Sequence, residues 1–249
     1  MTQVYNQNTH IGWDGKTNIA RFMESISKYC DALVAFDDGS TDGSRDVITE
    51  WSGSIEIEIP SNKVNTPDKE GYHRARSLEH CRRLGADFVL CLDTDELFEK
   101  KVGSHLIHAL CEGLDDSIDS IRFLTRHLWR TDRFARFDGH WGDPTEPRLF
   151  RLTDEVSYGQ LDGIRSSLSP DGMIGNTLSP IKIMHFGYSS DAEIQYKHKR
   201  FESLGIDLTK HIDDSNIKLF ESNTLMTELP VGPGIEVYRK RLELQNINS

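Results

Sequence analysis

The sequence lacks the features that mark several large classes of protein. It contains no run of eighteen apolar residues, so no segment is long enough to span a membrane. The first six residues are polar and lack the apolar core of a signal peptide. Its four cysteines lie in apolar stretches without the spacing of metal ligands: Cys30, Cys81, Cys91 and Cys111. We therefore expect reduced thiols in a cytoplasmic protein.

Basic residues are scarce. The chain has 29 Lys and Arg against 40 Asp and Glu, which gives a formal net charge of -11. Nucleic-acid binders present a basic face, so we expect no nucleic-acid partner. An anionic ligand such as a nucleotide diphosphate then needs a metal ion or a local arginine. The length of 249 residues and a hydrophobic content of 37% fit one large α/β domain.

The first hundred residues alternate between strand and helix patterns. Apolar residues at helical spacing predict helices over 18–30 and 72–85, with a shorter helix near 47–51. Strands are predicted over 32–36, 55–59 and 88–92. This order is typical of a mostly parallel sheet with helices on its faces. Ligands of such sheets bind beyond the carboxyl ends of the strands.

The second half has a less regular pattern. The predicted elements are a helix over 102–110, strands over 121–125, 148–152 and 181–187, and a charged helix over 191–204. Residues 1–17 give no clear element, and the aromatic, charged segment 129–147 is too long for a tight turn.

Two of the predicted strands end in acid. Asp93-Thr94-Asp95 follows one strand, and Asp37-Asp38-Gly39-Ser40-Thr41-Asp42-Gly43-Ser44 follows the other. Two carboxylates one residue apart repel each other unless a cation lies between them, and Mg²⁺ or Mn²⁺ prefers such hard oxygen ligands. We interpret the two strand ends as one shared site, with a solvated turn as the alternative at each.

A calcium loop is a second interpretation of the longer acidic turn. Asp38, Ser40, Asp42 and Gly43 fit positions 1, 3, 5 and 6 of the EF-hand spacing. The twelfth position is Thr49 where the loop needs Glu, and a strand precedes the turn where a helix is required.

These residues resemble the family 2 glycosyltransferases of the GT-A fold. The resemblance covers residues 13–100 and rests on Asn18 to Phe22, the acidic turn, Ala75-Arg76-Ser77 and Leu92 to Glu96. Weaker matches lie between Trp141 and Phe150 and at His185-Phe186-Gly187-Tyr188. Family members open with an apolar strand that ends in Asn-Glu, whereas the corresponding place here is Ile11 to Gly15.

The resemblance implies a single GT-A domain over 1–249. Residues 1–100 would form the nucleotide-sugar-binding half, residues 101–228 the acceptor half and residues 229–249 a carboxyl-terminal extension. The implied reaction is metal-dependent and inverting. A sugar would move from a UDP-, GDP- or dTDP-linked donor to a hydroxyl group of a glycan, lipid or protein.

The resemblance also implies roles for five residues of the first half. Asp37 and Asp38 would hold the base and ribose of the nucleotide. Asp95 would bind Mn²⁺ or Mg²⁺ directly, and Asp93 would reach the ribose or the metal shell. Arg76 would bind the diphosphate through paired donors, unless it is an ordinary solvated arginine of its helix.

In the second half, His185 is the candidate third metal ligand, with a packed histidine as the alternative. Lys197 and Arg200 would approach the diphosphate or, as we favour, form a solvated helix face. Trp129 and Trp141 would stack on a sugar or lie in the core.

An inverting transferase needs a base for the acceptor hydroxyl, and such a base contributes about 10²–10⁴-fold. We prefer Glu146 to Asp143, and Asp162 is a weaker candidate. Each of these residues also fits an ordinary loop acid.

Two other functions compete with sugar transfer. A sugar-1-phosphate nucleotidyltransferase resembles this pattern but carries an Arg-containing, Gly-rich loop after its first strand, and residues 1–17 offer only Gly12 and Gly15. A non-catalytic carbohydrate- or calcium-binding module would bind its ligand without turnover.

Overall fold

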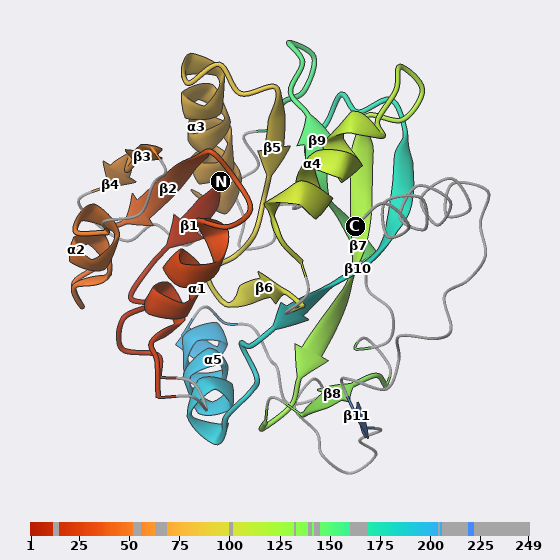
Figure 1. Cartoon of the computed structure of the whole chain (residues 1–249). Helices are drawn as coiled ribbons and strands as arrows, with labels where there is room; N and C mark the ends of the chain where they lie inside the picture. The colour runs from red at the N-terminus through yellow and green to blue at the C-terminus, as the bar shows by residue number, and fades with distance from the viewer. Residues whose placement is uncertain are drawn as a thin grey trace.

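The computed structural model describes residues 1–11, 15–51, 56–62, 69–99, 102–131, 133–138, 141, 145–159, 169–203, 205 and 219–221. The predicted general bases Asp143 and Asp162 lie outside these residues, as do Trp13 and nearly all of the tail after 205. Strands and helices largely alternate in the first half of the described chain, as the sequence predicted, and the second half consists mostly of strands (Figure 1).

The amino-terminal half contains a parallel sheet. Its strands are β1 (Thr2–Val4), β2 (Ala32–Asp38), β3 (Glu56–Glu58) and β4 (Ser61–Asn62). The other three strands all pair in parallel with β2. β1 lies along one edge of β2, and β3 and then β4 lie along the other edge. The connecting helices are α1 (Asn18–Ile26), α2 (Ser44–Thr49) and α3 (Glu70–Arg83).

The first strand lies earlier than the sequence indicated. We expected its place at 11–15, but β1 is Thr2–Val4 and pairs in register with Ala35 to Asp37 of β2. Its sequence is polar, and hydropathy alone did not reveal it. The side chains of Thr2 and Val4 are nevertheless buried, because β1 lies against β2 and α3.

The second sheet is mixed. Its strands are β5 (Phe88–Leu90), β6 (Glu96–Phe98), β7 (Ser120–Leu128), β8 (Phe134–Arg136), β9 (Thr145–Arg151), β10 (Asn176–His185) and β11 (Leu219–Glu221). β7 and β10 are parallel, and the other pairs in this sheet are antiparallel. The predicted parallel arrangement is therefore confirmed for β1 to β4, whereas β5, which the same pattern included, pairs antiparallel with β9.

The backbone of Met1 joins the two sheets. The amino group of Met1 donates a hydrogen bond to the Leu90 carbonyl oxygen at 2.5 Å. The Leu92 N–H donates to the Met1 carbonyl oxygen at 3.2 Å. β1 and the β5 segment are therefore neighbours, so the carboxyl ends of β1, β2 and β5 lie along one edge.

Two further helices complete the described fold, α4 (Ser104–Glu112) and α5 (Asp191–Ser203). α5 lies below α1 and β6 in the view of Figure 1, at the edge where the acidic turns end. None of the helices in the described ranges combines the length and apolar character needed to cross a bilayer.

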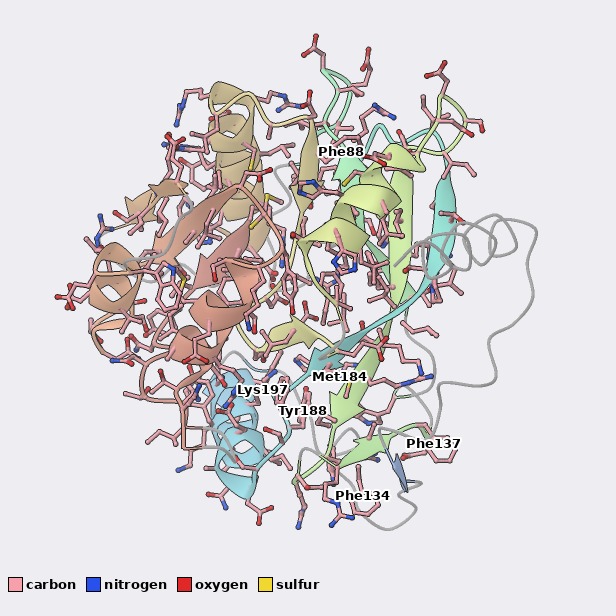
Figure 2. The ribbon with its side chains drawn as sticks, viewed as in Figure 1. Phe88, Phe134, Phe137, Met184, Tyr188 and Lys197 are labelled. Carbon is pink, nitrogen blue, oxygen red and sulfur yellow. The ribbon has the colours of Figure 1, made fainter. Side chains whose placement is uncertain are left out.

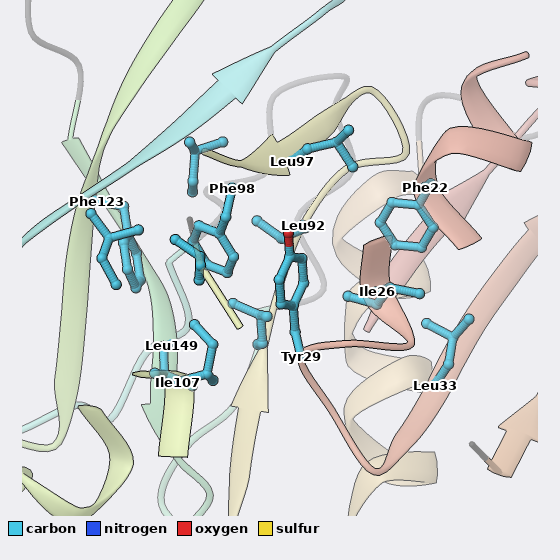
Figure 3. Close-up of a cluster of buried hydrophobic side chains, with 14 of the residues drawn as sticks. Phe22, Ile26, Tyr29, Leu33, Leu92, Leu97, Phe98, Ile107, Phe123 and Leu149 are labelled. Carbon is cyan, nitrogen blue, oxygen red and sulfur yellow. The ribbon is translucent and has the colours of Figure 1, made fainter. Parts of the chain in front are cut away.

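The core runs continuously from α1 to the second sheet (Figure 3). α1 begins at Thr17, whose side-chain oxygen accepts a hydrogen bond from the Ala20 N–H. Beyond its end, the ring of Tyr29 lies 5.2 Å from that of Phe98 on β6. Phe98 in turn lies 5.2 Å from Phe123 on β7. Contacts between these rings hold the two halves of the chain together.

We predict that Phe98→Ala lowers the free energy of unfolding by about 3–5 kcal/mol, because it leaves a cavity between the two halves. Denaturant unfolding followed by circular dichroism measures this loss. Ile174→Ala is the control: Ile174 is 73% exposed, so its removal changes stability by less than about 0.5 kcal/mol. Equal effects of the two substitutions would contradict the assignment of Phe98 to the core.

Candidate functional site

A cavity of about 240 Å³ lies beyond the carboxyl ends of β1, β2 and β5. α5 forms its opposite wall. The lining side chains include five carboxylates, those of Asp38, Glu70, Asp93, Asp95 and Glu193. Basic groups line it as well, namely His10, His73, His185, Lys197 and Arg200. Both acidic strand ends therefore contribute to one site, as the sequence predicted.

The turn after β2 is fastened to the segment that follows β1. Gly39 and Gly43 adopt positive φ angles of 76° and 83°, which glycine reaches without strain. The Asn6 side-chain oxygen accepts a hydrogen bond from the Thr41 N–H at 2.8 Å. Asp42 accepts hydrogen bonds from the N–H groups of Asn8 and Thr9 at 2.8 and 2.9 Å.

This geometry opposes the calcium-loop interpretation. The element before the turn is strand β2, whereas an EF-hand has a helix there. Asp42 directs its oxygens at N–H and hydroxyl groups of the protein, including the Ser44 hydroxyl at 2.6 Å. Across the described ranges, no group of three or more His, Cys, Asp or Glu side chains is arranged to hold a metal ion.

Asp37 and Asp38 point to different surroundings. Asp38 lines the cavity, and one of its oxygens lies 3.5 Å from Nε2 of His73 on α3. The His73 ring stacks on Phe36 with centroids 4.5 Å apart, which fixes its orientation. Asp37 instead accepts a hydrogen bond from the Ser40 N–H at 3.0 Å and does not line the cavity. Asp38 alone of the two faces a ligand in this cavity.

Asp93 is paired with an arginine that the sequence analysis passed over. Arg74 Nη2 lies 3.2 Å from Asp93 and 2.7 Å from Glu70. Arg76 is largely exposed and contacts the Tyr72 hydroxyl at 3.1 Å. Two residues along a helix turn the side chain by about 200°, so Arg74 and Arg76 face opposite ways. The structure thus brings Arg74, and not the predicted Arg76, to the acidic turn.

A buried ion pair supports the turn from below. Glu96 Oε1 lies 2.5 Å from Arg148 Nη2, and both side chains are less than 5% exposed. The other oxygen of Glu96 accepts a hydrogen bond from the Asp93 N–H at 3.0 Å. Arg148 belongs to β9, so a strand of the second half positions the acid pair. Sequence reasoning missed this pair, although Glu96 directly follows the acidic motif.

Asp95 and His185 lie together, as predicted for two metal ligands, at 3.2 Å between Oδ2 and Nε2. A third group, the Lys197 ammonium, lies 3.0 Å from the same oxygen and 3.3 Å from the same nitrogen. Burial opposes the charge on Asp95, yet Lys197 and His185 outweigh it and hold the pKa of Asp95 well below its ordinary value. Lys197 is therefore not part of a solvated helix face.

These residues do not fit a divalent metal ion in the described arrangement. A metal bound by Asp95 and His185 would need the position that the ammonium occupies, and two cations repel strongly at such separations. Asp93, the other candidate ligand, is engaged by Arg74.

His127 extends the cluster behind His185. The Nδ1 atoms of the two histidines lie 2.8 Å apart. Burial first, and then the neighbouring charges of His185 and Lys197, hold the pKa of His127 well below its ordinary value. His127 is therefore neutral near pH 7, and its ring packs edge-on against Trp141.

The two candidate stacking residues are packed in the interior. Trp129 and Trp141 are 2% and 8% exposed, and they form a cluster with Tyr188 and Ile194. The Arg136 guanidinium lies 4.4 Å from the Trp129 ring centroid. The core interpretation of both tryptophans is thus confirmed.

Glu146 lies within β9 and not in the loop before it. Its Oε2 accepts a hydrogen bond from the Ser169 hydroxyl at 3.1 Å. Glu146 precedes Arg148 by two residues on β9, and the pairing of β9 with β7 shifts register between them. It does not line the cavity described above.

The fold and site define an α/β protein with a ligand cavity at the strand ends where such folds bind nucleotides. A sequence model of glycosyl transferase family 2 matches residues 4–166, about two thirds of the chain. The chain belongs to this family. Its mixed α/β architecture fits the GT-A fold that the sequence motifs implied.

Comparison with solved structures finds distant likenesses. The structure of S. aureus TarS 1-349 in complex with UDP shares 19% sequence identity with this chain and has a TM-score of 0.38. The match covers 51% of this chain and 34% of the TarS chain. A nucleotidyl transferase from Methanothermobacter thermautotroptrophicus is 12% identical and has a TM-score of 0.39. That match covers 82% of this chain and 96% of the nucleotidyl transferase chain. This chain therefore spans about a third of that TarS chain.

A nucleoside-diphosphate-sugar pyrophosphorylase from Vibrio cholerae RC9 is 11% identical and has a TM-score of 0.42. The match covers 79% of this chain and 98% of the pyrophosphorylase chain. No curated protein matches the sequence.

We predict that Asp42→Ala destabilises the protein at neutral pH and that this effect disappears in acid. Burial alone would raise the pKa of Asp42, but hydrogen bonds from Ser44, Thr9 and Asn8 outweigh it and lower the pKa below its ordinary value of 3.8. A depressed pKa contributes stability above the unfolded pKa, and the contribution is lost as the pH falls through the folded pKa.

Urea unfolding between pH 7 and pH 2 measures the difference between Asp42→Ala and the unsubstituted protein. The exposed Asp116→Ala is the control and shows no such convergence. A difference that stays constant over this range would contradict the role given to the Asp42 carboxylate.

Proposed function

We propose that this protein transfers a sugar from a nucleoside-diphosphate donor to an acceptor hydroxyl, with inversion at the anomeric carbon. The observation that carries the proposal is the cavity, which unites the turn after β2, the acid pair after β5 and the basic face of α5. Family membership supports sugar transfer over the alternatives. Donor, acceptor and stereochemistry belong to the proposal.

The donor nucleotide would lie along the ends of β1 and β2. Asp38 would accept hydrogen bonds from a base N–H or from ribose hydroxyls. His73, whose ring is fixed by Phe36, lies at the floor beside it. Asp93, the more exposed acid of the pair, would accept a ribose hydroxyl. The diphosphate would then lie toward α5, where Lys197 and Arg200 supply positive charge.

The acceptor would approach from the side of β9. In a single displacement, its oxygen bonds to the anomeric carbon while the bond from that carbon to the diphosphate oxygen breaks. Both electrons of the broken bond leave with the nucleoside diphosphate. The acceptor proton passes to a carboxylate, for which Glu146 is our candidate. Its place outside the donor cavity suits a base that acts on the opposite face of the sugar.

The decisive experiment follows the products. The purified protein is incubated with UDP-, GDP- and dTDP-linked sugars, and free nucleoside diphosphate is measured. A transferase releases nucleoside diphosphate. A nucleotidyltransferase would instead release pyrophosphate from a nucleoside triphosphate and a sugar 1-phosphate. A binding module would retain its ligand without turnover. Pyrophosphate release or plain binding would overturn the proposal.

We predict that Asp38→Asn weakens donor binding by at least about tenfold, because one charge-assisted hydrogen bond contributes about 1.5–3 kcal/mol. Isothermal titration with the donor nucleotide measures the change. Arg76→Ala is the matched control, since Arg76 lies on the exposed face of α3 and leaves the affinity unchanged. A weaker affinity in the Arg76 variant would restore the role that the sequence motif implied.

Glu146→Gln is predicted to retain donor affinity and to slow transfer by at least about a hundredfold, because the acceptor hydroxyl loses its base. Single-turnover kinetics separates this effect from donor binding. Ser169→Ala removes the hydrogen bond to Glu146 but keeps its carboxylate, and slows transfer far less. Normal transfer by Glu146→Gln would leave Asp143 as the candidate.

A further inference from the structure

We propose that the ammonium group of Lys197 supplies the positive charge at Asp95 that neutralises the leaving diphosphate, so that sugar transfer needs no divalent cation. This inference rests on the proposed function, because it assigns a charge to the donor side of the same site. It concerns one side chain of α5, drawn beside Tyr188 in Figure 2.

The ammonium is held by three groups from two segments of the chain. Asp95 follows β5, and His185 ends β10, and each lies within 3.3 Å of Lys197 Nζ. The Tyr188 ring centroid lies 4.6 Å away, a cation–π contact. An ammonium has three N–H donors, and the carboxylate of Asp95 accepts one of them. Lys197 also lines the cavity, where a phosphate oxygen can accept another.

A glycine makes room for this arrangement. A Cβ atom built on Gly187 would lie 2.1 Å from Lys197 Nζ and 2.5 Å from Asp95 Oδ2. Any other residue at 187 would push the ammonium away from the carboxylate. Gly187 sits between His185 and Tyr188, so the same short segment provides two contacts to the ammonium and the space it occupies.

α5 is fixed in the position that the pair requires. The buried Glu193 lies 3.2 Å from Nδ1 of His10, in the segment after β1. Tyr196 packs edge-on against the same His10 ring. Glu193 lies one helical turn before Lys197 on α5, and Tyr196 directly precedes Lys197. The ammonium is therefore placed by the packing of the helix, and Asp95 is 14% exposed beside it.

Two single positive charges lie where a metal site would hold one divalent cation. Arg74 lies against Asp93 and also against Glu70, and Lys197 lies against Asp95.

In the transfer step, Lys197 stays protonated. The acceptor oxygen forms its bond to the anomeric carbon, and the diphosphate oxygen leaves with the electron pair of the broken bond. The acceptor proton goes to the carboxylate base. The ammonium donates a hydrogen bond to the leaving diphosphate as its negative charge grows. The site needs no further co-reactant.

The test compares Lys197→Met with Lys199→Met, two residues on from it on α5. Lys199 is exposed and does not line the cavity, so it is the matched control. UDP, GDP and dTDP are titrated calorimetrically into each full-length protein in EDTA and in Mn²⁺. Nucleoside diphosphate release from the donor sugars is measured under the same conditions.

We expect the unsubstituted protein to bind one of the nucleoside diphosphates in EDTA and to turn over within about twofold of its rate in Mn²⁺. Lys197→Met should weaken this binding by about 10- to 100-fold, as loss of a charge-assisted hydrogen bond implies. Lys199→Met should bind normally. Binding or turnover that requires Mn²⁺ in the unsubstituted protein overturns the proposal, as does normal binding by Lys197→Met.

Two further variants keep the result interpretable. Lys197→Met leaves Asp95 unpaired and for that reason could fail to fold. In that case the double variant Lys197→Met, Asp95→Asn is used, because it removes both charges. Gly187→Ala keeps the charge of Lys197 but displaces it, and should also weaken binding in EDTA. If no sugar donor is turned over, the proposed function fails, while metal-independent binding lost in Lys197→Met still supports the ammonium site.

Discussion

The pairing of carboxylates with cations is the constraint on which this structure depends. Five acids line one small cavity, and four basic residues lie against them: His73, Arg74, Lys197 and His10. Arg74 meets Glu70 on its own helix, and the other pairs join segments far apart in the sequence. The charges that make the cavity suited to a nucleotide therefore also hold α3, α5 and the strand ends in place.

Sequence patterns foresaw the first half of the fold well, because a hydrophobic strand followed by an amphipathic helix has a strong periodic signal. β2, α3 and β5 lie where predicted, and both acidic turns meet at one edge. The sequence did not reveal β1, because its residues are polar and show no apolar pattern. They are buried only through contacts with neighbouring elements. The mixed pairing of β5 to β11 depends on contacts between distant strands, which no local pattern encodes.

The same distinction applies to the site. Asp38, Asp93, Asp95 and His185 were predicted from motifs, and the structure places all of them around the cavity. The motif implied Arg76, but Arg74 is the arginine beside Asp93, because a motif records sequence spacing and not the direction of a helix face. For Lys197 the sequence favoured a solvated helix face for a different reason. Its partner lies 102 residues earlier, and only the close approach permitted by Gly187 brings the two together.

The Glu96–Arg148 pair has a consequence for redesign. Arg148 follows Glu146 by two residues on β9, and through Glu96 it reaches the backbone of Asp93. Removing one member of a buried ion pair leaves the other charge uncompensated. With the roles proposed above for Glu146 and Asp93, β9 connects the acceptor side of the site mechanically to the donor side. Engineering toward new acceptors will have to leave that strand intact, or the change will also be felt at the donor end.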